Sequence, residues 1–171
     1  MQKYLSVSGI NVKTVLYDIV MLSLITFLPA ISHLIGFPLY LIEPARIILL
    51  VSIAHTEKNN VFILAVAIPV FSFMLSGHPA LFKMILIISE MSLNVWLFFY
   101  FSRIFNNNFG ALFNSILISK IYYYWIKYFM INTGLIKGEL ISTPFYLQFA
   151  VAIFLSAYVY LMTDKNSIKK T

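Results

Sequence analysis

Long apolar runs constrain this chain more than any other feature. A helix that crosses the hydrocarbon core of a bilayer needs roughly 20 mostly apolar residues, and fewer where other helices cover it. The chain contains six such runs, separated by short breaks rich in Gly, Pro, Asn and charged residues, at about 14–33, 38–55, 61–76, 80–102, 110–130 and 144–163. Backbone groups in hydrocarbon must be satisfied within a helix or a closed barrel. The runs lack the alternation of barrel strands, so they predict helices.

The composition places this protein in lipid rather than in water. Of the 171 residues, 61% are hydrophobic and 11% are charged, which is more apolar surface than a soluble domain of this length can bury. The N-terminal stretch MQKYLSVSGINVK is polar, and no signal-peptide cleavage pattern follows the first apolar run. No repeat or linker divides the chain. We therefore predict an all-α integral membrane protein with a single transmembrane domain over residues 1–171, built as a six-transmembrane-helix bundle.

The basic residues predict how the bundle is oriented. Cytoplasmic loops of membrane proteins carry an excess of Lys and Arg. With the N-terminus inside, the cytoplasmic side holds most of the basic loop residues, namely Lys3, Lys13, Lys58, Arg103, Lys165, Lys169 and Lys170. We expect a multi-pass protein of the cell membrane, surrounded by membrane lipid, with both termini in the cytoplasm. Nucleic-acid binding is not expected, because no basic run interleaves with exposed aromatic residues.

The run 80–102 carries charges where a membrane helix usually has none. Lys83, Glu90 and Asn94 follow one another at i, i+7 and i+11, which places them on one face of a helix. A charge at the centre of a bilayer costs about 3 kcal/mol, so such a group usually faces a bundle interior or a wet cavity. This face is therefore predicted to line an interior site.

Two other runs carry similar polar faces. Glu43 and Arg46 form an i, i+3 pair, and Lys120, Tyr124 and Lys127 share one helix face. Three polar stripes at similar depth predict one pocket that opens to the outside of the cell. Its basic groups outnumber its carboxylates, which favours a substrate with a carboxylate or a phosphate. The predicted substrate-binding residues are Glu43, Arg46, His78, Lys83, Glu90, Asn94, Lys120, Tyr124 and Lys127.

Purely structural roles for the same residues stay open. In one alternative, Glu43 and Arg46 form an ion pair that only fixes helix packing. In another, Lys83 and Lys127 extend along their stems to reach lipid headgroups. The YYYW run at 122–125 is typical of an aromatic belt at a membrane interface as well as of a ligand cage.

The motifs give little support to catalysis or to metal binding. Cysteine is absent, and the three histidines match no metal-ligand spacing. SGHP at 76–79 is similar to one element of membrane lipid phosphatases, but the later His and Asp of that family would fall on Phe109 and Phe113. No glycine-rich nucleotide-binding motif occurs. We expect no catalytic residue, no metal and no cofactor in this chain.

Two stretches resemble a family of transport proteins. FPLYLIEPARIILL (37–50) and SGHPALFKMILIISEMSLNVW (76–96) place glycine or proline ahead of a helix with polar residues at membrane depth. In this respect, and in its six short helices, the chain resembles the S component of energy-coupling factor (ECF) transporters, which are substrate-capture membrane subunits for vitamins and trace nutrients. The resemblance implies an S-component-like fold, a small vitamin-like substrate, and partnership with a membrane coupling subunit and cytosolic ATPases.

Two other function classes stay open beside this one. A membrane scaffold or assembly subunit, with no transport role, predicts that the buried charges pair with each other and leave no cavity. A small intramembrane hydrolase or transferase predicts a cleft that contains His78 and a phosphate-sized site.

If the resemblance to S components holds, docking to a coupling subunit would use small residues such as Ala150, Ala152 and Ser156, or else the protein works with a different partner.

Overall fold

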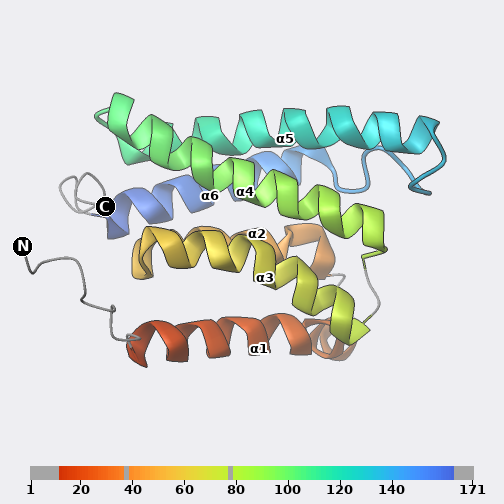
Figure 1. Cartoon of the computed structure of the whole chain (residues 1–171). Helices are drawn as coiled ribbons and strands as arrows, with labels where there is room; N and C mark the ends of the chain where they lie inside the picture. The colour runs from red at the N-terminus through yellow and green to blue at the C-terminus, as the bar shows by residue number, and fades with distance from the viewer. Residues whose placement is uncertain (1–11, 37–38, 77–78, 164–171) are drawn as a thin grey trace, which may run out of the picture.

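The computed structural model describes residues 12–36, 39–76 and 79–163, and every regular element in these ranges is a helix. Six α-helices and one short 3-10 helix (η1) follow each other along the described chain (Figure 1). They are α1 (Val12–Ile35), η1 (Leu39–Ile42), α2 (Pro44–His55), α3 (Lys58–Ser76), α4 (Leu81–Ile104), α5 (Asn108–Asn132) and α6 (Phe145–Met162). The all-helical prediction is confirmed for this part of the chain.

Three of the described helices are long and apolar enough to cross a membrane. They are Lys58–Leu75 in α3, all of α4, and all of α6. α2 has only 12 residues, or about 18 Å at the usual helical rise. α5 has 25 residues, but Lys120 and the tyrosines beside it make it more polar than the other long helices. The prediction of a membrane protein is supported at this level, while the count of six spans stays a prediction.

The predicted continuous helix over 38–55 is wrong, because the chain breaks between η1 and α2. Glu43 at the break has φ 53° and ψ 58°, in the left-handed region that non-glycine residues rarely adopt. Pro44 explains the position of the break, since the residue before a proline is disfavoured in the helical region and proline itself suits a first helical position. The Glu43 carbonyl accepts the first hydrogen bonds of α2, from the N–H of Arg46 (2.9 Å) and Ile47 (3.1 Å).

Five helices form a closed ring. α2 packs on α3, α3 on α4, α4 on α5, α5 on α6, and α6 on α2, while α1 lies outside the ring against α3 (Figure 1). α1 begins and α6 ends at the same end of the bundle, which we call the terminal end. The opposite end, which we call the loop end, holds η1 and the connection 133–144 between α5 and α6 (Figure 1).

The ring closes around an apolar core. Leu50, Leu64, Val95 and Phe98 are among its fully buried members. Small residues let α5 approach its neighbours closely, a common device in membrane bundles. The fully buried small residues of α5 stand at i, i+4 and i+8, and they are Ala111, Ser115 and Ser119.

Candidate functional site

A cavity of about 540 Å³ lies toward the loop end of the ring. Residues of α1 to α5 and of the connection between α5 and α6 line it, so most of the chain contributes to one space. The volume falls within the range of pockets that bind small molecules. Its polar lining consists of Glu43, Arg46, Ser72, Lys83, Glu90, Lys120, Tyr123, Tyr124, Ser142 and Thr143.

Four charged side chains on the cavity wall bond to one another, and we call them the charge cluster: Glu43, Arg46, Glu90 and Lys120. The Arg46 guanidinium donates to Glu90, and its second nitrogen lies 3.2 Å from a Glu43 oxygen. The Lys120 ammonium donates to Glu43 and lies 3.8 Å from Glu90. Each basic group therefore contacts both carboxylates, and the cluster is neutral in formal charge.

Three helices bring the charge cluster together. The break before α2 places Glu43 and Arg46 on the first turn of a helix that starts inside the bundle. α4 contributes Glu90 from its middle, and α5 contributes Lys120. Arg46 and Glu90 are buried, whereas the Glu43 side chain keeps 22% of its surface exposed. Glu43 is therefore the cluster's most accessible carboxylate.

The structure places six of the nine predicted binding residues on the cavity wall: Glu43, Arg46, Lys83, Glu90, Lys120 and Tyr124. Asn94 does not line the cavity, because it is buried one turn further along α4 and donates to Ser119 Oγ at 2.9 Å. His78 lies outside the residues that the structure describes.

Lys127 also lies off the cavity wall, and it has a different role from the one expected. The residue is buried, and its ammonium donates to the Leu140 carbonyl at 2.8 Å. It also lies 5.7 Å from the centre of the Tyr123 ring. The alternative that Lys127 extends to lipid headgroups is wrong, because this contact instead ties α5 to the connection that borders the cavity.

The aromatic run on α5 divides between two environments. Tyr123 and Tyr124 line the cavity, and the Lys120 ammonium lies 5.5 and 5.8 Å from their ring centres. Gln148 of α6 donates to the Tyr124 hydroxyl at 2.6 Å and fixes that ring. Trp125 is exposed on the outside of the bundle, where an interfacial aromatic residue is expected. The run therefore presents Tyr123 and Tyr124 to the cavity and Trp125 to the outside, and both interpretations stay predictions.

Several polar residues of the wall are not among the nine predicted binding residues. Tyr123 belongs to the YYYW run that the sequence offers as an aromatic belt or a ligand cage, and it follows Lys120 at i+3, so helical spacing places it near the face that carries Tyr124. Ser142 and Thr143 belong to the long connection after α5. Nothing in their local sequence indicates that this connection folds back over the cavity.

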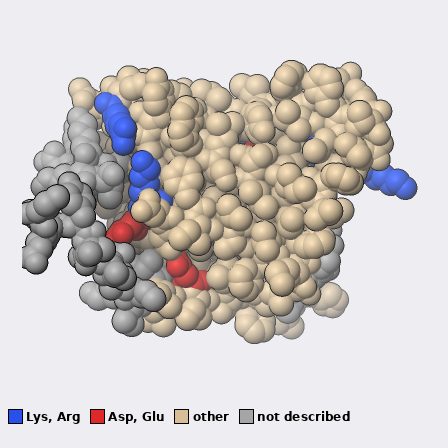
Figure 2. All heavy atoms as spheres, viewed as in Figure 1, with Lys and Arg blue, Asp and Glu red and all other residues tan. Residues whose placement is uncertain are grey.

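The cavity can hold a small anion. Three basic side chains line it, against two carboxylates, and Lys83 has no ion pair within the described ranges. Figure 2 shows the contrast with the outer surface, where the face in view is almost entirely uncharged between its two ends. Charge-assisted hydrogen bonds to a carboxylate or phosphate are strong when water is partly excluded.

Metal binding finds no support in the part of the chain that is described, where no three His, Cys, Asp or Glu side chains cluster to hold an ion. No protein-family model, curated protein or solved structure matches this chain.

Proposed function

We propose that this protein is a membrane-embedded binding protein for a small anionic molecule, and that it is not itself an enzyme. The observation that carries the proposal is the cavity at the loop end, with its surplus of basic side chains. A phosphate or carboxylate would sit near Arg46, Lys83 and Lys120, and the Tyr123 and Tyr124 rings would contact the apolar part of the ligand.

The scaffold alternative is favoured by one observation and opposed by another. Pairing within the charge cluster is what a scaffold predicts. A filled bundle is its second prediction, and a cavity of about 540 Å³ speaks against it. We therefore rank binding first and scaffolding second. The hydrolase alternative depends on His78, which lies outside the described residues.

Ligand binding would replace the Glu43 carboxylate, as a partner of Arg46 and Lys120, by the anionic group of the ligand. In the unliganded protein, Glu43 and Glu90 neutralise Arg46 and Lys120. An entering anion competes with the more exposed Glu43, whose left-handed backbone sits at the junction of η1 and α2. Displacement of this side chain would remove contacts that hold a strained residue in place. Binding would thereby be coupled to movement of the η1–α2 junction.

The resemblance to ECF S components suggests a finer form of the same proposal. The cavity would open to the outside, both termini would be cytoplasmic, and the substrate would be a vitamin-like micronutrient. Delivery would need a membrane coupling subunit and cytosolic ATPases. Of the three small residues expected for docking, Ala152 and Ser156 are buried within the bundle, so the expectation is wrong for these two and the docking proposal keeps the exposed Ala150 on α6. Co-purification of such subunits with the tagged protein tests this part independently of ligand binding.

Native mass spectrometry of the gently purified protein tests the binding proposal. We expect a bound, nonlipid anion in the wild type and its loss in Lys83→Gln. Lys83 suits this test because it lines the cavity without an ion pair to break within the described chain, so its removal leaves the fold intact. Lys137→Gln is the matched control, since Lys137 is exposed in the α5–α6 connection and lies off the cavity wall.

Equal occupancy in wild type, Lys83→Gln and Lys137→Gln would overturn the assignment of the cavity. An empty protein that also gains no thermal stability from a panel of small carboxylates and phosphates would favour the scaffold instead.

A further inference from the structure

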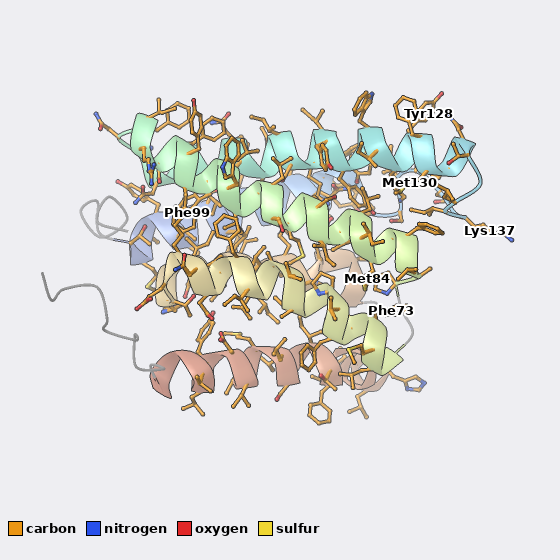
Figure 3. All side chains as sticks on the ribbon, viewed as in Figure 1. Phe73, Met84, Phe99, Tyr128, Met130 and Lys137 are labelled. Carbon is orange, nitrogen blue, oxygen red and sulfur yellow. The ribbon has the colours of Figure 1, made fainter. Side chains whose placement is uncertain are left out.

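A second hollow lies at the other end of the bundle, away from the charge cluster. It has a volume of about 80 Å³ and lies between the first turns of α3 and the last turns of α4. Its six lining residues are Lys58, Phe62, Trp96, Phe99, Tyr100 and Arg103, and we call this hollow the terminal groove. Phe99, at its centre, lies toward the terminal end, far from Met84 at the loop end of the same helix (Figure 3).

Two basic side chains of the terminal groove are without a carboxylate partner among the described residues. Lys58 begins α3 and Arg103 stands in the last turn of α4, and no ion pair joins either to another described side chain. The Lys58 ammonium lies 5.3 Å from the centre of the Phe99 ring. Glu57, beside Lys58, is exposed and does not line the groove. Basic and acidic side chains gather near this end of the face shown in Figure 2.

The aromatic side chains of the groove continue from these charges toward the middle of α4. Trp96 and Tyr100 stack with ring centres 5.6 Å apart and an interplanar angle of 8°, and about half of each side chain is exposed. Trp96 precedes Arg103 by seven residues, which is about 10 Å along a helix. Charges at the helix ends and aromatic residues one to two turns deeper match the headgroup and upper acyl regions of a phospholipid.

The size of the groove separates it from the large cavity. Its volume of about 80 Å³, against about 540 Å³ for the large cavity, suits a small group such as a phosphate rather than a ligand of the size that the cavity would hold. The remainder of a ligand would lie outside, along the exposed faces of Trp96 and Tyr100. A lipid satisfies this condition, because its acyl chains stay in the bilayer.

We propose that the terminal groove is a binding site for an anionic phospholipid, whose phosphate lies between Lys58 and Arg103 and whose acyl chain follows Trp96 and Tyr100. Basic pockets between transmembrane helices bind such headgroups, and each basic side chain at a charged membrane surface contributes about a fivefold gain in affinity. This site is independent of the proposed function of the large cavity.

The chain has two tryptophans, which makes the test direct. Trp125→Phe leaves Trp96 as the single tryptophan, whose emission is read with excitation at a wavelength that the 11 tyrosines do not absorb. We would reconstitute this variant in phosphatidylcholine vesicles that contain a minor fraction of brominated lipid, either brominated phosphatidylglycerol or brominated phosphatidylcholine, and measure quenching of Trp96. Quenching by phosphatidylglycerol is expected to exceed that by phosphatidylcholine at equal mole fraction, with a local enrichment of about tenfold or more.

Charge removal should abolish this preference. In the Trp125→Phe background, Lys58→Gln with Arg103→Gln is expected to make the two brominated lipids equally effective, while Lys137→Gln keeps the preference. Near-wild-type thermal stability of the double variant would show that it folds. Equal quenching by both lipids in the parent, or an unchanged preference in the double variant, would overturn the proposal. The groove would be assigned to free anions rather than to lipid if the parent shows no enrichment of phosphatidylglycerol but gains thermal stability from inorganic phosphate, and the double variant does not.

Discussion

The loop half and the terminal half of this bundle are built from the same helices but differ in what fills them. Toward the loop end, α2, α4 and α5 direct charged side chains into a cavity of about 540 Å³. Beyond Glu90 and Lys120, the same three helices bury apolar and small residues that leave little space, among them Leu50, Val95 and Phe98. Charged groups keep one half open because they need polar partners, whereas apolar side chains close the other half by packing.

A single amide contact marks the boundary between the halves. Asn94, one turn beyond Glu90, donates to Ser119, which directly precedes Lys120. The charge cluster lies on the loop-end side of this contact, and the aliphatic and aromatic core lies on its terminal-end side. Charged and apolar residues on the same helices therefore create two separate environments, an open half around the cavity and a packed half around the core.

Arg46→Ala should have the largest effect, because it removes both a buried ion-pair partner and a basic group of the cavity. It leaves the buried Glu90 carboxylate with Lys120 as its only described basic neighbour. Removing one partner of a buried ion pair destabilises a protein by about 3–5 kcal/mol. The free energy of unfolding, measured by titration with a denaturing detergent in mixed micelles, should fall by about that amount. Anion binding should also be lost.

The double variant Arg46→Met with Glu90→Met provides the control. It removes one basic and one acidic group together and leaves the Glu43–Lys120 pair intact. Apolar replacement of a whole buried pair is often neutral for stability. Most of the lost stability should therefore return, but anion binding should not. If the double variant is as unstable as Arg46→Ala, the loss does not come from an unpaired charge.

Phe98→Ala should act on the packed half alone. Phe98 is fully buried in the apolar core, and truncating such a ring costs about 3 kcal/mol because a void remains. We expect a lower free energy of unfolding with an unchanged dissociation constant for the anion, measured at a temperature where the variant is folded. A large loss of affinity in folded Phe98→Ala would contradict the division into two halves.

Glu43→Gln should increase anion affinity rather than decrease it. The variant removes the carboxylate that competes with the ligand for Arg46 and Lys120. We expect a dissociation constant about tenfold lower, since removal of a nearby negative charge favours an anion. Equilibrium binding to the purified variant measures this effect. Glu57→Gln at the terminal end is the charge-matched control, and weaker binding by Glu43→Gln would show that Glu43 instead holds the ligand directly.

Ser119→Ala should have the smallest effect. It removes the hydroxyl that accepts from Asn94, while a small side chain still allows close packing. Hydrogen bonds between membrane helices contribute about 0.6 kcal/mol on average. A loss of stability of this order, with unchanged anion binding, is expected from the same detergent titration. A marked change in binding would place the amide contact inside the site rather than at its boundary.

Helical spacing predicted much of the site, and tertiary contacts decided the rest. The i, i+3 and i, i+7 relations of Glu43 with Arg46 and of Lys83 with Glu90 correctly placed these residues on faces that converge on one cavity. Spacing could not tell that the open space ends one turn before Asn94, because that depends on Ser119 of another helix.

Two further features depended on context that the local sequence does not carry. Lys127 has the spacing of a cavity residue, but its partner is a loop carbonyl thirteen residues away. The apolar run at 38–55 predicts one continuous helix, but the chain breaks at Glu43 and Pro44 begins α2. Both errors arise where a backbone group, rather than a side-chain pattern, determines the conformation.

Thiol labelling would show directly whether the cavity is open and electropositive. The protein has no cysteine, so a single substitution gives a protein with one thiol. Ile87→Cys places this thiol on the cavity wall, and Ile116→Cys places it in the packed half. We would compare the rates at which an anionic and a cationic methanethiosulfonate modify each variant in vesicles. We expect that Ile87→Cys reacts, faster with the anionic reagent, that Lys83→Gln reduces this preference, and that Ile116→Cys stays unreactive. An unreactive Ile87→Cys, or a preference for the cationic reagent, would contradict this expectation.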